Sequence, residues 1–163
     1  MPEYTETELR NLHVVRRFLN EEPPPDDKSE LFAEDGVWWN GLALIHPEGG
    51  TEHRGRQAIR RLLPSQNVGA KLLPGRDRYD MSTAEIADVI TLADGDFVVR
   101  QQTFRATTMR GRQYENTYCF VFRFNEQGEI AYLTEHWNTW HAARSLLDAY
   151  DVPPARPFGD EEA

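Results

Sequence analysis

The stretch 115–140, ENTYCFVFRFNEQGEIAYLTEHWNTW, decides the predicted fold. Its two halves alternate side chains in the manner of β-strands, and the turn at 125–128 separates them. It therefore predicts an antiparallel hairpin with strands over about 112–124 and 129–138.

On the second strand, Ala131, Leu133, Glu135 and Trp137 share one face because side chains alternate along a strand. If that face is buried, the pKa of the Glu135 carboxyl rises, and the group becomes suited to acid/base chemistry near neutral pH. If the face is open to water, Glu135 is an ordinary surface residue. Alternation by itself favours the second interpretation.

The first strand of the hairpin places aromatic side chains on one face. This pattern favours a hydrophobic core, and the alternative is a flat-sided pocket for a ring-containing substrate. The opposite face carries Thr117, Val121, Arg123 and the only cysteine, Cys119, which is expected to be a small hydrophobic side chain in the core or an interface. The aromatic face comprises Tyr114, Asn116, Tyr118, Phe120, Phe122 and Phe124.

Upstream of the hairpin, turns at 94–95 and 110–111 separate two further predicted strands, 84–93 and 96–109. The four strands together predict an antiparallel meander. Residues 64–80 are predicted to be mainly loop, and 46–55 a polar loop. A last helix is expected at about 140–150.

The N-terminal part alternates helices with one strand. Thr5 and Glu8 form a capping-box pattern that opens a helix over about 6–20, followed by a stiff polar connector at 21–27. A short helix then begins at Ser29, contacts the core through Leu31 and Phe32, and stops at Gly36. A strand is predicted at 37–44 and a helix at 56–63, ended by Pro64. This order is typical of an α+β fold.

Size and charge limit the function classes. The 163 residues fit one domain over 1–150 and a Pro-rich acidic tail at 151–163. A net charge of −9 argues against nucleic acid and anionic membranes as partners. The apolar runs are too short for a membrane helix, and the N-terminus lacks the pattern of a secretory signal. With a single cysteine, these features lead us to expect a cytoplasmic protein.

Three motifs carry a family resemblance: LFAEDG at 31–36, GRQAI at 55–59, and GEI at 128–130 before Glu135. Their order and spacing resemble the SnoaL-like branch of the nuclear-transport-factor-2-like superfamily. The resemblance implies a cone-shaped barrel, in which a curved, mainly antiparallel sheet wraps around the N-terminal helices. It also implies a homodimer that forms through the outer sheet face.

Within that superfamily, the hairpin resembles the phenazine-biosynthesis A/B proteins at Glu115-Asn116, Tyr118, Glu135 and Asn138. The resemblance implies that Glu135 is an acid/base in a ring-forming condensation. In that family a histidine on an earlier strand assists, whereas this chain has no histidine between positions 53 and 136.

The chain is also similar to limonene-epoxide-hydrolase-like proteins, which activate water with Tyr-x-Asn, Arg-x-Asp and a final Asp. Here Trp38-x-Asn40, Arg100-x-Gln102 and Glu135 stand in the same order. The amide of Gln102 cannot transfer a proton as an acid does, so that mechanism is not carried over intact.

Strand alternation places Arg100 and Gln102 on one face with Phe104, which indicates either an internal polar pair or an outer interface. Contact between Arg100 and Glu135 would suit Glu135 to be a base, and no contact would suit it to be an acid. Asn40 could hold a water or a substrate carbonyl, or else bond its own backbone before Gly41.

The histidines give no strong sequence signal for a catalytic or metal-binding role. His136 is expected to point away from Glu135 by alternation. His46, Glu48, Glu52 and His53 are metal-capable, but their spacing matches no standard zinc pattern, and a solvated loop is the favoured interpretation. No metal and no cofactor are expected.

The sequence thus predicts a cofactor-independent isomerase, dehydratase, cyclase or condensation catalyst for a small apolar or aromatic, cyclic or polyketide-like metabolite. Glu135 would be the acid/base, Arg100 would polarise the substrate or tune Glu135, and Asn40 with Gln102 would supply orienting hydrogen bonds. The alternatives are epoxide hydration by water activation, and a non-catalytic ligand-binding or dimeric interaction module. The expected substrate-binding residues are Trp38, Gln102, Phe104, Asn116, Tyr118, Phe120 and Trp137.

Overall fold

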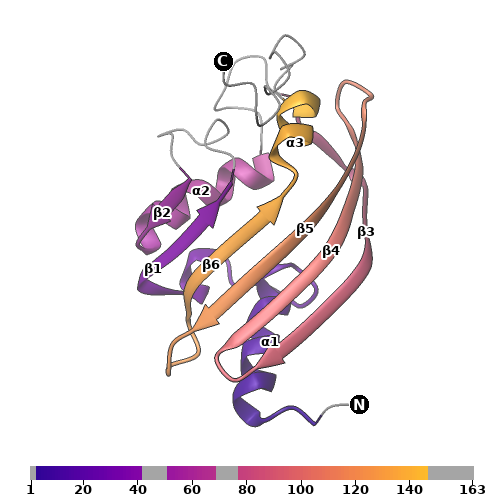
Figure 1. Ribbon diagram of the computed structural model, residues 1–163. Helices are drawn as coiled ribbons and strands as arrows, with labels where there is room; N and C mark the ends of the chain where they lie inside the picture. Colours follow the sequence, from indigo (N-terminus) through magenta and orange to yellow (C-terminus); the bar gives the residue numbers. More distant parts are fainter. Residues whose placement is uncertain (1–2, 42–50, 69–76, 147–163) are drawn as a thin grey trace, which may run out of the picture.

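The computed structural model describes residues 3–41, 51–68 and 77–146, with side chains omitted for 64–68. Its elements alternate helix and strand at first and then become almost entirely strand (Figure 1). In chain order they are α1 (Glu6–Phe18), a 3-10 turn (Lys28–Leu31), β1 (Phe32–Asn40), β2 (Glu52–Arg54), α2 (Arg56–Val68), β3 (Tyr79–Asp94), β4 (Phe97–Thr108), β5 (Gln113–Phe124), β6 (Ile130–Trp137) and α3 (Thr139–Leu146).

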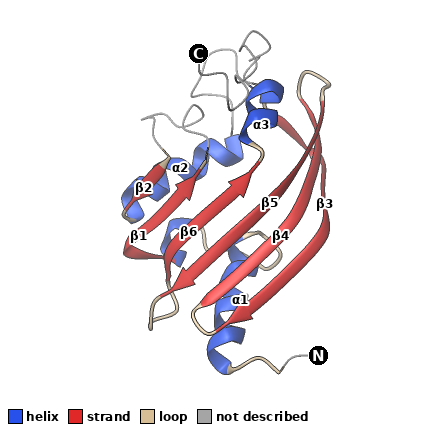
Figure 2. Ribbon diagram, viewed as in Figure 1, coloured by secondary structure: helices blue, strands red, loops and turns tan. Residues whose placement is uncertain are grey.

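The strands form one curved sheet in the order β2-β1-β6-β5-β4-β3. Strands β3 to β6 are the predicted antiparallel meander, whereas β1 runs parallel to β6 and pairs with β2 on its other side. Helices α1 and α2 lie behind the sheet in the view of Figure 2, and α3 follows the end of β6. The α+β expectation is confirmed.

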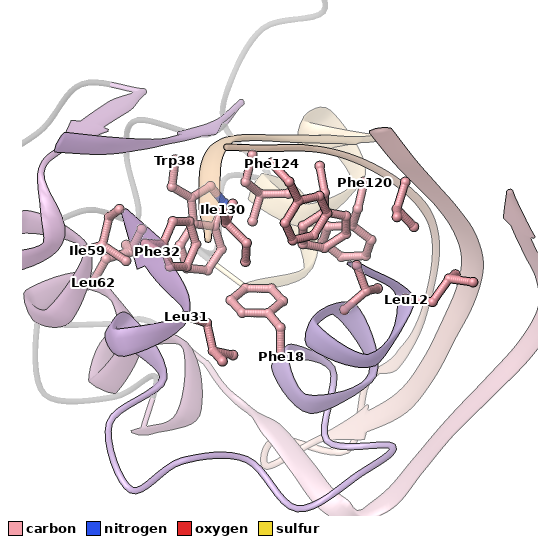
Figure 3. Close-up of a cluster of buried hydrophobic side chains, with 14 of the residues drawn as sticks. Leu12, Phe18, Leu31, Phe32, Trp38, Ile59, Leu62, Phe120, Phe124 and Ile130 are labelled. Carbon is pink, nitrogen blue, oxygen red and sulfur yellow. The ribbon is translucent and has the colours of Figure 1, made fainter. Parts of the chain in front are cut away.

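The hydrophobic core fills the space between α1 and the sheet. The Thr5–Glu8 capping box opens α1 as predicted, and the helix turns Leu12, Val15 and Phe18 toward the strands. The Phe18 ring meets Trp38 edge-on at 5.4 Å between centroids, and it meets two phenylalanine rings in the same way (Figure 3). The aromatic face of β5 contributes Phe120, Phe122 and Phe124 to this core.

The short second helix differs from its prediction at both ends. Asp27, not Ser29, is the N-cap, and its carboxylate accepts the Ser29 backbone N–H at 2.9 Å. Phe32 already belongs to β1, and Gly36 lies inside that strand instead of ending a helix. A Cβ at Gly36 would stand 2.9 Å from the carbonyl oxygens of both Ala33 and Ile130, so the glycine serves the irregular backbone of β1 and its close approach to β6.

Three further features differ from the prediction: the end of α2, the start of β3 and the presence of β2. Helix α2 continues through Pro64 to Val68, because a proline removes one helical hydrogen bond and does not always end the helix. Strand β3 begins at Tyr79 within the predicted loop, and β2 forms within the predicted loop 46–55. The predicted segments 42–44 and 147–150 and the tail 151–163 lie outside the described residues. Among the described helices, none is long and apolar enough to cross a membrane.

Gly36→Ala tests the packing of β1 on β6. The added methyl group must push the two strands apart, and we expect the free energy of unfolding to fall by about 1–3 kcal/mol, as for overpacked cores. Urea denaturation measures this change. Gly111→Asn is the matched control, because Gly111 has a left-handed φ of 81° that asparagine tolerates and open space around its Cα. Equal stability of both variants would contradict this account of β1.

Candidate functional site

One row of side chains crosses the concave face of the sheet and organises the site. Strand register places Asn40 beside Glu135, Glu135 beside Phe120, and Phe120 beside Arg100. Arg100 is in turn beside Thr91 of β3. Neighbouring strands lie about 4.8 Å apart, so the residues predicted to form the site stand in one line on a rigid scaffold.

Glu135 is buried, with 5% of its surface exposed. Its Oε2 atom accepts a hydrogen bond of 2.7 Å from Asn40 Nδ2 and one of 3.2 Å from Trp38 Nε1. Both donors are themselves 1% exposed. The surface interpretation of Glu135 is therefore wrong, and the Asn40 amide serves the carboxyl group. Because a buried carboxylate is costly unless hydrogen-bonded, these two N–H groups supply the stabilisation that its charged form needs.

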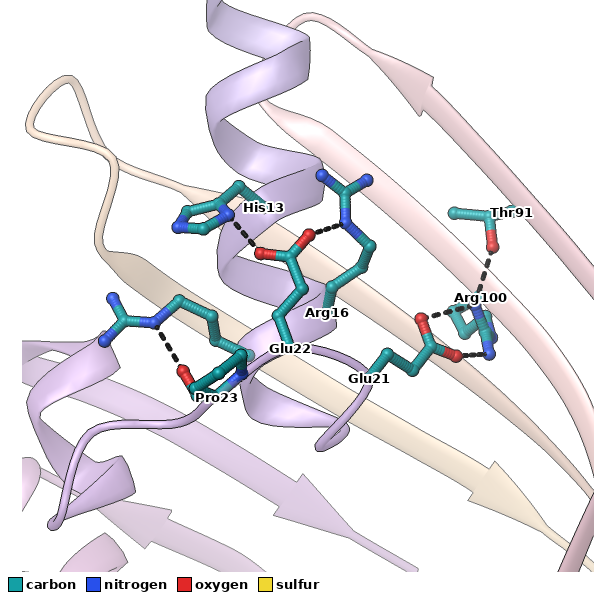
Figure 4. Close-up of polar contacts among 8 residues, drawn as sticks. His13, Arg16, Glu21, Glu22, Pro23, Thr91 and Arg100 are labelled. Atoms are coloured by element: carbon teal, nitrogen blue, oxygen red, sulfur yellow. Dashed lines mark hydrogen bonds and ion pairs between the residues drawn. The ribbon is translucent and has the colours of Figure 1, made fainter.

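Arg100 lies on the inner face, as the internal interpretation predicted, but it does not pair with Glu135. Its Nε donates to Gln102 Oε1 at 3.1 Å and its Nη1 to Thr91 Oγ1 at 3.0 Å. Its two terminal nitrogens bind both carboxylate oxygens of Glu21 (Figure 4). In the row, Phe120 stands between Arg100 and Glu135.

Sequence reasoning missed Glu21, which belongs to the connector after α1. It treated residues 21–27 as a spacer, and the only available signal was an acidic pair next to the end of a helix. No local pattern specifies that this carboxylate reaches a cation 79 residues away on β4.

A pair of buried tyrosines extends the polar site along β5. The hydroxyl groups of Tyr114 and Tyr118 lie 2.9 Å apart, and Asn116 Nδ2 donates to the Tyr114 oxygen at 2.9 Å. Burial raises the pKa of both phenols, most strongly for Tyr118, and the charge of Glu135 raises them further. Both hydroxyls therefore stay protonated near neutral pH, within electrostatic reach of Glu135.

Four of the five predicted substrate-binding aromatics come together as one wall around Tyr118, whereas the Trp38 ring packs against Phe18 and Phe32. Trp137 stacks on the Tyr118 ring at 5.2 Å, and Phe120 stacks on it at 5.9 Å. Phe104 meets the same ring edge-on at 6.4 Å. Gln102 pairs with Tyr118 in the strand register, so it also faces this wall.

The histidines divide between the two sides of the sheet. His136 is exposed and lies beside Trp39, on the side opposite Glu135, as alternation predicted. His141 of α3 stacks on Tyr114 at 5.3 Å, and sequence reasoning missed it. His46 and Glu48 lie outside the described residues. The described part of the chain contains no cluster of metal-binding side chains.

The arrangement is suited to proton transfer on an apolar molecule. It combines a buried carboxyl group fixed by two N–H donors, two protonated phenols, and a wall of rings. Such a set can accept a proton from carbon and donate hydrogen bonds to an oxygen on which negative charge develops.

Comparisons with known proteins identify the family to which this architecture belongs. The family model of the SnoaL-like domain matches residues 15–133. None of the curated protein sequences matches the chain significantly.

Solved structures share the fold at low sequence identity. A phenazine biosynthesis-related protein from Pseudomonas aeruginosa is 17% identical with a TM-score of 0.63, covering 98% of this chain and 95% of its own. TerC, co-crystallised with polyporic acid, is 13% identical with a TM-score of 0.61, covering 83% and 97%. An LEH-like epoxide hydrolase from M. tuberculosis is 20% identical with a TM-score of 0.56, covering 90% and 98%.

These likenesses agree with the curved sheet and its helices, and the family model spans most of the described core. The chain belongs to the family of SnoaL-like domains.

Proposed function

We propose that this protein is a cofactor-independent enzyme that moves a proton on a ring-containing, polyketide-like metabolite, with Glu135 as the general base. The observation that carries the proposal is the burial of Glu135 with two N–H donors on one carboxylate oxygen. A carboxyl group placed at this cost inside a protein is a strong candidate for chemistry.

The contacts of Glu135 favour a base over an acid. Arg100 does not touch Glu135, which on the charge argument alone would favour an acid. Trp38 and Asn40 take over the role of the cation, because each donates an N–H to the carboxylate. The ionised form is the one that these donors stabilise, and it is the form that removes a proton.

The reaction follows from these roles. Glu135 takes a proton from a carbon next to a carbonyl group, and the C–H electron pair moves into the resulting enolate. The phenol of Tyr118 donates a hydrogen bond to the enolate oxygen. Return of the proton from Glu135 to the far carbon of a conjugated double bond completes an isomerisation. Alternatively, the enolate carbon attacks a second carbonyl of the same molecule, the new C–C bond closes a ring, and the resulting alkoxide takes the proton from Glu135.

The wall formed by Phe104, Tyr118, Phe120 and Trp137 supports a flat cyclic substrate. Two structural neighbours point the same way, since one is related to phenazine biosynthesis and another was crystallised with polyporic acid. We place the reaction in the cytoplasm, which suits a chain with one cysteine.

Epoxide hydration is the rival reaction, favoured by the Asn40–Glu135 contact and by the epoxide hydrolase neighbour. Against it stand the amide of Gln102, which cannot transfer a proton, and Arg100, which Glu21 engages. A ligand-binding module without chemistry is the remaining alternative, and it would bind ring ketones without exchanging their protons.

The convex sheet face supports a homodimer. Outward-facing side chains border an open groove of about 220 Å³ on this face, on the side of the sheet opposite Glu135. They combine apolar and aromatic groups with one arginine, as protein interfaces do. The lining residues are Phe97, Val121, Arg123, Tyr132 and Thr134.

Exchange of carbon-bound protons tests the base directly. In D₂O, we expect the protein to catalyse deuterium uptake into the methyl group of 2-acetonaphthone, a bicyclic aryl ketone. Glu135→Gln keeps the shape and loses the titratable group, so catalysed exchange should fall by roughly 10²–10⁴-fold. Proton NMR of the ketone follows the exchange.

Glu126→Gln is the control, because Glu126 lies in the exposed turn between β5 and β6. Equal exchange by wild type and Glu135→Gln would refute the assignment of Glu135. Incorporation of solvent oxygen-18 into an epoxide substrate, without ketone exchange, would instead establish the rival hydration.

The dimer is tested by sedimentation equilibrium at micromolar concentration, where we expect a dimer mass. Val121→Asp places a charge in the apolar groove and should shift the chain to monomer without loss of folding. A wild-type protein that sediments as a monomer would contradict the proposal.

A further inference from the structure

We propose that Glu21 makes this site select uncharged ring substrates, because it occupies the carboxylate-binding side of Arg100. The inference rests on the proposed function in one respect, namely that a ring substrate lies along the row between Glu135 and Arg100. Glu21 is then a residue that determines specificity, and ring carboxylic acids are excluded as substrates.

The ion pair already uses the N–H groups of Arg100 that bind a carboxylate best. A guanidinium binds a carboxylate best through two parallel N–H groups, and Glu21 takes this position with one oxygen on each terminal nitrogen of Arg100. Gln102 and Thr91 occupy further donors. These contacts engage four of the five N–H groups of Arg100, so no second forked pair remains for a substrate carboxylate.

The connector holds Glu21 in place before any ligand binds. The Glu21 backbone N–H donates to the Arg16 carbonyl at 2.9 Å, and the Glu22 N–H donates to the same oxygen at 3.2 Å. The Glu22 carboxylate pairs with Arg16 and His13 on α1 (Figure 4). Because its backbone is already fixed at the end of α1, Glu21 competes with a dissolved carboxylate at little entropic cost.

Glu21 neutralises the charge of Arg100, which is the more deeply buried of the two side chains. The Arg100 side chain is 5% exposed, whereas that of Glu21 is 36% exposed. A buried cation attracts an anion strongly when it lacks a partner. With Glu21 present, the far end of the row is an ion pair without net charge, and a second carboxylate there would meet the repulsion of the first.

The row also sets the size of the substrate. Arg100 and Glu135 are separated by two strand spacings, about 10 Å, with the Phe120 ring between them. A fused-ring molecule with its reactive carbon at Glu135 extends to the Arg100 end. The geometry thus favours fused-ring ketones and phenols, whose oxygen can accept a hydrogen bond from the Gln102 amide.

Two probes with the same ring skeleton test this selection: neutral 2-acetonaphthone and anionic 2-naphthoate. Isothermal titration calorimetry should show wild type binding the ketone at least tenfold more tightly than the carboxylate. Glu21→Gln frees the fork of Arg100, and its affinity for 2-naphthoate should rise roughly 10- to 100-fold, as charge-assisted hydrogen bonds form. Its affinity for the ketone should change less than about fivefold, which is the contribution of one ordinary hydrogen bond.

Glu22→Gln is the matched control. It removes the same charge from the next residue, but Glu22 pairs with Arg16 and His13 and not with Arg100, so binding of 2-naphthoate should not change. The double variant Glu21→Gln/Arg100→Gln should lose the gain. If circular dichroism shows Glu21→Gln unfolded, Glu21→Asp retracts the carboxylate by one methylene and must shift the affinity ratio in the same direction.

All affinities are also measured in the Glu135→Gln background, which removes the proposed base. Selection by Glu21 should persist there, so failure of the catalytic proposal and failure of this one are distinguishable. Equal affinity of wild type for the two probes would overturn the inference. So would an unchanged ratio in Glu21→Gln, a gain that survives loss of Arg100, or binding of neither probe by any variant.

Discussion

The parallel pairing of β1 with β6 is the constraint on which the site depends. It sets Asn40 beside Glu135, and alternation along β1 turns Trp38 toward the same carboxyl group. Without these two donors, burial of a carboxylate in an aromatic core would destabilise the fold by several kcal/mol. The same contacts that make the buried acid tolerable therefore fix its orientation.

Two charged centres share the concave face, and an aromatic ring keeps them apart. Glu135 is held by neutral N–H donors at one end of the row, whereas Arg100 is matched by Glu21 at the other. Phe120 separates them in the register. This separation leaves the carboxylate of Glu135 outside the Arg100 ion pair, and it spreads the polar contacts over two strand spacings.

Local sequence patterns predicted the features that depend on neighbouring residues. The alternation around Glu135 and the turns of the meander gave the correct strands, and the Thr5 capping box gave the first helix. The contacts that could not be predicted are distant in sequence. Glu21 reaches Arg100 only because α1 lies across β4, and Trp38 reaches Glu135 across 97 positions. Gly36 misled the prediction because a glycine suits a close strand contact as well as a helix end.

The site depends on an ionisable Glu135 that the Trp38 indole holds inside the protein. The Trp38 N–H proton resonance, assigned with Trp38→Phe and followed by NMR during a pH titration of the folded protein, tests it most directly. We expect an upfield shift as the pH falls and the carboxylate that accepts this bond takes up a proton, and no such shift in Glu135→Gln. If the chemical shift of the Trp38 N–H proton does not change with pH in wild type, or changes equally in Glu135→Gln, Glu135 is not the group that titrates there.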